Sequence, residues 1–166
     1  MYKAIGIIFL SLFLLVFTGI FSIAVAATGT AFTSFSIAVS PINELSISGA
    51  TVTLTIVDPG TPTNPSAATN NGTTYNITTN SANTKIKAQL DTAVPTGTTL
   101  TLNLAAPGTA TSQGDVTLTT TASDIVTGIK GNASSGNVIT YKFYTTPAAG
   151  TFSGVTRTVT LTISEL

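Results

Sequence analysis

Apolar residues alternate with threonine or serine along most of this 166-residue chain, and this period of two constrains the fold more than any other feature. Successive side chains of an extended backbone point to opposite faces, so alternation is typical of a strand with one buried and one solvated face. The last run, residues 155–163, is the most regular, because threonines occupy one face and apolar residues the other: Val155, Val159, Leu161 and Ile163. The pattern predicts half-buried β-strands.

Elsewhere after residue 26, the same alternation recurs in short runs that are separated by turn sequences such as Pro95-Thr96-Gly97 and Pro107-Gly108. No window has the spacing of an amphipathic helix, although residues 121–129 could hold a single helical turn. We therefore expect an all-β fold, an antiparallel β-sandwich of the Ig-like or jelly-roll-like kind with about 8–9 strands. The other expected strands fall at residues 35–39, 45–47, 52–56, 75–77, 86–90, 100–104, 116–118 and 139–143.

The residue types that are missing exclude many kinds of chemistry. The chain has no His, Cys or Trp, and only 7% of its residues are charged. Without imidazole or thiolate groups it cannot build a Ser-His-Asp triad, a Cys-His pair, an ordinary zinc site or a disulfide. A formal net charge of zero also provides no basic surface for nucleic acid. We expect no enzyme activity, no cofactor and no nucleic-acid partner.

Residues 1–26 have the three-part pattern of a secretory signal peptide. Lys3 precedes an apolar stretch over residues 4–25, which we expect to be helical, and Ala24-Val25-Ala26 supplies the small residues of a cleavage site. The alternative is an uncleaved membrane anchor, because about 20 apolar residues can span a bilayer. Both interpretations place the rest of the chain outside the cytoplasmic membrane, secreted or on the cell surface. The membrane then takes part only in export or through that anchor.

After the signal segment we expect an N-terminal strand over residues 27–40 and a sandwich domain over residues 41–166. Pro41 separates the two. Phe35, Ile37 and Val39 alternate along the first part and are candidate contacts for assembly with another subunit. A domain of this size can bury a core without disulfides.

The few charged residues carry weak signals, and each has a structural alternative. Asp115 and Asp124 both adjoin turn residues, where aspartate usually bonds its own backbone rather than serving as a catalytic acid. Lys85 and Lys87 flank Ile86 and leave the same strand face. They could form a basic patch for an acidic glycan, together with Lys130 and Lys142, or keep an exposed strand soluble.

Three Asn-x-Ser/Thr sequons are candidate glycosylation sites in a secreted chain, and they also arise by chance in a sequence rich in Asn and Thr. Their acceptors are Asn71, Asn76 and Asn132. The only aromatic cluster is Tyr141, Phe143 and Tyr144, of which the first two should face the core and the third the solvent. We expect no sugar-binding platform there.

Two stretches carry a resemblance to known proteins. Residues 147–154, Pro-Ala-Ala-Gly-Thr-Phe-Ser-Gly, lead into the last alternating run, and residues 73–79 read Thr-Thr-Tyr-Asn-Ile-Thr-Thr. Both resemble secreted pilin-like β-sandwich domains of the spore-coat-U and fimbrial type, although such domains often carry cysteines. More loosely, the chain is similar to cysteine-free matrix-fibre subunits of the TasA and archaeal bundling-pilus kind. The resemblance implies a secreted subunit of surface structures, sometimes joined by strand donation.

Together these observations predict a structural subunit of a cell-surface filament, coat or extracellular matrix, which assembles with itself or with other surface subunits. Residues 27–40 would be the donated strand. The alternative is a surface adhesin or glycan-binding module, whose specificity would lie in the loop at residues 58–72. Its Pro, Thr and Asn content favours a spacer over a shaped pocket.

Overall fold

The computed structural model describes residues 29–49, 51–56 and 65–166. The chain divides into two units, Met1–Ala38 and Val39–Leu166, and all the strands of the described residues belong to the second. The predicted signal segment at residues 1–26 lies outside the described residues, as do residues 58–64 of the predicted loop. In the part that is described, no helix combines the length and apolar character needed to span a bilayer.

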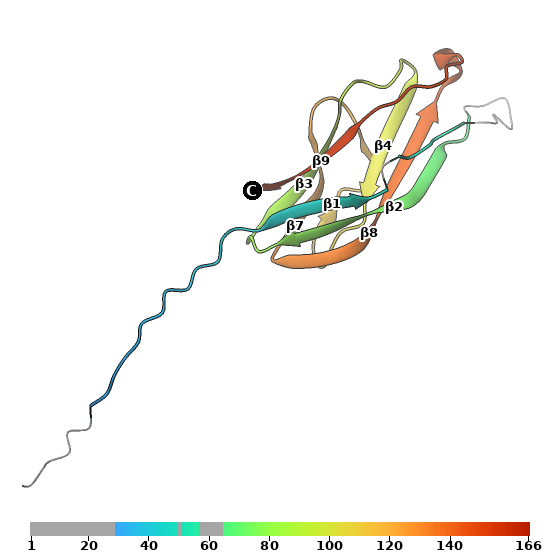
Figure 1. The fold of residues 1–166 in the computed structure, drawn as a ribbon. Helices are drawn as coiled ribbons and strands as arrows, with labels where there is room; N and C mark the ends of the chain where they lie inside the picture. Colours follow the sequence, from blue (N-terminus) through green and yellow to red (C-terminus); the bar gives the residue numbers. More distant parts are fainter. Residues whose placement is uncertain (1–28, 50, 57–64) are drawn as a thin grey trace, which may run out of the picture. The chain divides into compact units, whose positions relative to one another are not determined.

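The described part of the second unit is all-β, as the alternation predicts (Figure 1). Its strands form two antiparallel sheets, one of five strands in the order β1-β2-β8-β4-β6 and one of four in the order β5-β7-β3-β9. A single 3-10 turn, Pro147–Ala149, precedes β9. The strands are β1 (Asn43–Ser48), β2 (Ala68–Thr79), β3 (Thr84–Leu90), β4 (Thr98–Leu104), β5 (Thr111–Ser112), β6 (Val116–Thr117), β7 (Ser123–Ile129), β8 (Asn132–Thr145) and β9 (Val159–Glu165).

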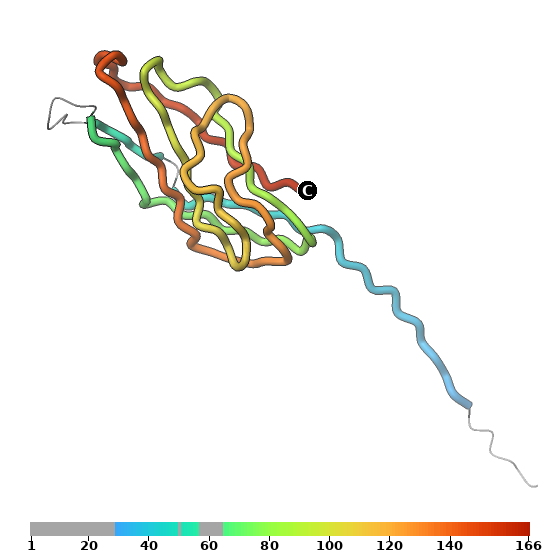
Figure 2. The backbone as a smooth tube through the Cα atoms, turned by 180° about the vertical axis from the view of Figure 1, so that it is seen from behind, coloured from blue at the N-terminus to red at the C-terminus, as the bar shows by residue number. Residues whose placement is uncertain are grey.

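After β2 the chain passes from one sheet to the other at every step, so neighbours in each sheet are distant in sequence. The tube in Figure 2 shows these crossings at both ends of the two layers. The turns suit such connections: Gly97 adopts a φ of 78°, and Thr98 N donates to Pro95 O at 3.1 Å. Only glycine adopts this conformation at little cost, which explains the Pro-Thr-Gly sequence.

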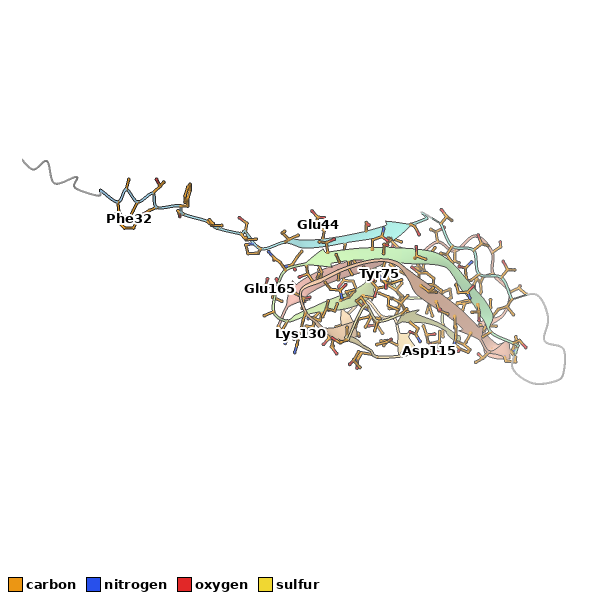
Figure 3. The ribbon with its side chains drawn as sticks, turned by 90° about the horizontal axis from the view of Figure 1, so that it is seen from below. Phe32, Glu44, Tyr75, Asp115, Lys130 and Glu165 are labelled. Carbon is orange, nitrogen blue, oxygen red and sulfur yellow. The ribbon has the colours of Figure 1, made fainter. Side chains whose placement is uncertain are left out.

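The core lies between the two sheets and takes apolar side chains from both. Leu102 and Ile139 of the larger sheet and Ile86 and Ile125 of the smaller one are fully buried. Tyr75 is also buried between the layers (Figure 3), and burial raises the pKa of its phenol to about 12. Its hydroxyl stays protonated and donates to Ala105 O, which satisfies the one polar atom this side chain brings into the core.

Threonine mostly occupies the outer face, with four exceptions. Thr73, Thr79, Thr84 and Thr101 are buried. Thr84 Oγ1 donates to Ile129 O at 3.3 Å, and Thr79 Oγ1 donates to Asn43 Oδ1 at 2.6 Å. Among the described residues, the hydroxyls of Thr73 and Thr101 are buried without a hydrogen-bond partner. The expectation that threonine faces water is therefore incomplete, and a nearby backbone or amide oxygen accounts for two of the four buried threonines.

Several predicted elements differ from the structure. Residues 121–129 hold no helical turn, since β7 occupies Ser123–Ile129 and packs Ile125 and Val126 into the core. Residues 68–72, predicted to be loop, form the start of β2, where a register shift between Asn70 and Thr73 accommodates the polar residues. The final strand begins at Val159 rather than Val155, and residues 52–56 form no strand.

Candidate functional site

The described part of the N-terminal segment, defined as residues 29–40, is exposed and forms no strand in the single chain. Phe35, Ile37 and Val39, the predicted assembly residues, are 83%, 89% and 77% exposed, and Phe32 is 90% exposed. Large apolar side chains gathered in one exposed segment mark an interaction site. In an extended conformation the three alternating residues would share one face.

Asn80 holds the chain where it enters the second unit. Ile42 N donates to Asn80 Oδ1 at 2.7 Å, and Asn80 Nδ2 donates to Ser40 O at 2.8 Å. The backbone N of Asn80 also donates to Ile42 O at 3.2 Å. These three bonds fix the backbone from Ser40 to Ile42 and continue the pairing of β1 with β2 beyond Asn43.

Each sheet ends in one long and one short edge strand. The long edges are β1, of six residues, and β9, of seven, and these two strands contact each other. The other two edges, β5 and β6, have two residues each. Very short edge strands offer little to pair with, whereas a long one presents a row of free N–H and C=O groups. Within the described residues, β1 and β9 are therefore the edges suited to accept a further strand.

The hydrogen-bond register identifies which backbone groups of β9 are free. Asp91 N donates to Thr158 O at one end of the β3–β9 pairing, and Leu166 N donates to Asn83 O at the other. Bonded and non-bonded pairs alternate in an antiparallel ladder, so the intervening even-numbered residues of β9 bond to β3. Among the described residues, the free groups belong to the odd-numbered residues of β9: Val159, Leu161 and Ile163, whose side chains face the core, and Glu165 at the end of the strand.

Two stretches that alternate in sequence remain unpaired. Among the described residues, no backbone–backbone hydrogen bond involves residues 51–56 or residues 151–157. Val52 and Leu54 nevertheless pack against the core, and Phe152 and Val155 are 43% and 42% exposed. These two stretches therefore combine a strand-like sequence with no partner strand among the described residues.

A polar cluster joins the two sheets where β1 begins and β9 ends. Ser81 Oγ and Asn43 Nδ2 donate to Glu165 Oε1 at 2.6 and 3.1 Å (Figure 3). The hydrogen bond from Ser81 lowers the pKa of Glu165, and the bond from Asn43 lowers it further. A pocket of about 400 Å³ adjoins the cluster and is lined by Val39, Pro41, Asn80, Ser81, Ala82, Asn83, Glu165 and Leu166.

This cluster makes stability depend on pH. The pKa of Glu165 is lower in the folded chain than its usual value of 4.5. The ionised carboxylate therefore stabilises the fold fully above pH 4.5, and this stabilisation is lost as the pH falls through the pKa of the folded chain. We expect the melting temperature of Glu165→Gln to lie below that of the wild type at pH 6 and the difference between the two to be smaller at pH 3. Thermal melts at both pH values measure this. If the difference in melting temperature between the two chains were the same at both pH values, the stabilising role of the ionised carboxylate would be contradicted.

Among the described residues, four of the charged side chains form two ion pairs, one on each sheet. Lys85 Nζ lies 3.0 Å from Asp124 Oδ2 on the outer face of the smaller sheet. Lys142 Nζ pairs with Asp115 Oδ2 on the larger sheet. The hydrogen bond from Lys142 lowers the pKa of Asp115, and the same bond raises the pKa of Lys142. Lys142 therefore does not join Lys85 and Lys87 in one basic patch, since the two sheets present opposite outer faces.

The three sequons differ in accessibility. Asn71 and Asn76 are exposed on β2, and Asn76 Oδ1 accepts a hydrogen bond from Gly136 N at 2.9 Å. Asn132 is partly buried, and its Oδ1 is shielded from solvent without a hydrogen-bond partner. Of the three acceptors, Asn132 is thus the least accessible to a modifying enzyme.

The aromatic residues of β8 lie as predicted. Tyr141 is 8% exposed and belongs to the core, whereas Tyr144 on the opposite face is 38% exposed. Phe143 packs edge-on against Phe152, with ring centroids 6.3 Å apart. This contact ties the unpaired residues 151–157 to the end of β8.

No protein-family model matches the chain, and no curated protein matches it at a significant level. Within the described ranges, no three acidic side chains come close enough together to hold a metal ion. The exposed N-terminal segment and the two long sheet edges are therefore the candidate functional surfaces of the described residues.

Proposed function

We propose that this chain is an exported structural subunit of a cell-surface filament, coat or extracellular matrix, and that its copies join by β-strand donation. The observation that supports this most directly is the exposed alternating row of Phe35, Ile37 and Val39, next to a domain with two long unpaired edges. An extended peptide that adds to a sheet edge gains affinity from main-chain hydrogen bonds and specificity from alternate side chains.

The proposed architecture is an Ig-like or jelly-roll-like β-sandwich, which two antiparallel sheets around one core support. Such a domain is a rigid building block, and its low charge suits close packing of subunits. With 7% charged residues there is little electrostatic resistance to pairing between edges. The pilin-like resemblance of residues 73–79 and 147–154 agrees with this role.

The proposal includes no catalysis and no cofactor. The carboxylates of Asp115 and Asp124 are each paired with a lysine, on different sheets, which supports a structural role for both rather than an acid/base pair. The sequence lacks the imidazole and thiol groups on which most nucleophilic and general-base chemistry depends. Export is proposed from the signal pattern at residues 1–26, and the partners are other copies of this chain or other surface subunits.

Deleting residues 27–38 tests the proposal. The truncated chain keeps Ser40, Ile42 and the Asn80 bonds, so we expect it to fold with an unchanged melting temperature and to remain monomeric. The chain that begins at Ala27 should form large assemblies at the same concentration. Sedimentation velocity measures both, and a chain with residues 27–38 in scrambled order is the matched control. Assembly of the truncated chain, or a monomeric intact chain at high concentration, would refute strand donation.

A further inference from the structure

The geometry points to β9 as the acceptor: the N-terminal segment of one copy pairs with the free edge of β9 in a second copy, with Ile37 opposite Leu161. This inference rests on the proposed function and specifies where the donated strand binds. The donated strand consists of residues 33–40 of another copy of this chain, and it binds one edge of the domain.

The smaller sheet is one strand short of the larger one, and β9 is the long strand at its open side. The core-facing residues of β9, Val159, Leu161 and Ile163, are only partly buried, although the residues opposite them on β3 are fully buried. Ile47, which faces the core from the neighbouring strand β1, is 41% exposed. A strand added beside β9 would make the sheets equal in number and cover this apolar surface.

Donor and acceptor match in spacing and in charge. The N-terminal segment has an apolar residue at every second position from Phe35 to Val39, and β9 has one at every second position from Val159 to Ile163. In the pair these two rows lie opposite each other. The three apolar residues of β9 have free N–H and C=O groups, so each can bond to the donor. Neither residues 29–43 nor residues 158–164 contain a charge, so pairing buries no unpaired ion.

The competing edge, β1, fits the donor less well. Its core-facing row is Asn43, Leu45 and Ile47, so only two of the three positions are apolar. Asn43 is already engaged with Thr79 and Glu165. Each of the two long edge strands carries one charge, Glu44 near the start of β1 and Glu165 at the end of β9 (Figure 3), so charge does not separate the two edges.

The donor cannot reach this edge within its own chain by a tight turn. Only Ser40, Pro41 and Ile42 separate Val39 from β1, so a reversal would have to occur within these residues. Tight two-residue hairpins need a positive φ, which proline cannot adopt, and the Asn80 bonds hold this backbone in register with β2. The acceptor must therefore belong to a second copy.

The absence of native cysteine allows a direct cross-linking test. With Ile37 opposite Leu161, residue 38 lies on the outer face beside residue 160 if the strands are antiparallel, or beside residue 162 if they are parallel. Ala38→Cys is mixed with a size-tagged chain carrying Thr160→Cys, Thr162→Cys or, as the matched control on the competing edge, Ser46→Cys. Each mixture is allowed to assemble, oxidised and analysed on non-reducing gels.

We expect mixed disulfide dimers with Thr160→Cys or Thr162→Cys in about tenfold excess over Ser46→Cys, because the bond forms only when the Cα atoms lie within about 7 Å. Equal or greater cross-linking to Ser46→Cys, or assemblies without a cross-link to either β9 position, would overturn the choice of β9 and leave strand donation standing. Failure of the intact chain to assemble, measured in parallel by sedimentation, would overturn both.

Discussion

Replacing Ile37 by lysine is expected to abolish assembly and to leave the domain folded. Ile37 is 89% exposed in the single chain, so the substitution removes no contact from the folded monomer. In the proposed complex the same side chain is buried between sheets, where an unpaired ammonium group is strongly unfavourable. We expect sedimentation velocity to show monomer only, and the thermal melt to match that of the wild type.

The neighbouring residue provides the matched control for this substitution. Ala38→Lys introduces the same charge one residue away, on the opposite face of the donated strand. Its ammonium group would remain in water in the complex, so assembly should continue with at most a modest loss. If both variants assemble equally well, or if both fail equally, the apolar row of the N-terminal segment is not what joins the subunits.

Replacing Leu102 by alanine is expected to have the largest effect on stability. Leu102 is fully buried in β4, a central strand of the five-stranded sheet. Removing a buried leucine side chain of this kind lowers the free energy of unfolding by about 3 kcal/mol, because apolar contacts are lost and a cavity remains. Because the described residues hold no disulfide or metal site to compensate, the domain would lose much of its free energy of unfolding. Urea denaturation measures the change.

A substitution at an exposed threonine tests whether the loss of unfolding free energy in Leu102→Ala comes from the core. Thr117 is exposed on the short edge strand β6, so Thr117→Ala should change the free energy of unfolding by less than about 0.5 kcal/mol. Below its own melting temperature the Leu102→Ala chain should still assemble, since its N-terminal segment and β9 are unchanged. A loss below about 1 kcal/mol for Leu102→Ala would contradict the two-sheet core.

Alternation in the sequence was sufficient to predict the fold class. Polar residues alternate with apolar residues in β3, β4 and β9, and this period of two is typical of a strand with one buried face. The order of strands could not be predicted in the same way, because the chain changes sheets at every step after β2. Pairing between distant segments depends on tertiary packing, which a local period does not encode.

Two predicted strand segments differ from the structure because they lack a partner. Residues 52–56 and 155–157 alternate as strands do, yet they have no neighbouring strand to bond within the described chain. Residues 121–129 were ambiguous because Gly128 and several polar residues interrupt the period, and packing of Ile125 and Val126 decides in favour of β7. The two-residue strand β5 is too short for any period to reveal.

The candidate site was predictable only on the donor side. Phe35, Ile37 and Val39 stand out in sequence because they alternate before a proline. The acceptor edge could not be predicted, because the free face of β9 follows from the sheet order and the hydrogen-bond register. Asn80 also gave no sequence signal, since its three bonds to residues 40 and 42 arise only when β1 pairs with β2.

Electron microscopy of the purified chain that begins at Ala27 tests strand donation between copies most directly. We expect regular fibres or sheets for this chain and isolated particles for Ile37→Lys, which keeps the same folded domain. The Ala38→Lys chain should resemble the wild type. Isolated particles for the wild type, or fibres that persist in Ile37→Lys, would contradict the claim that copies of this chain assemble through the apolar row of Phe35, Ile37 and Val39.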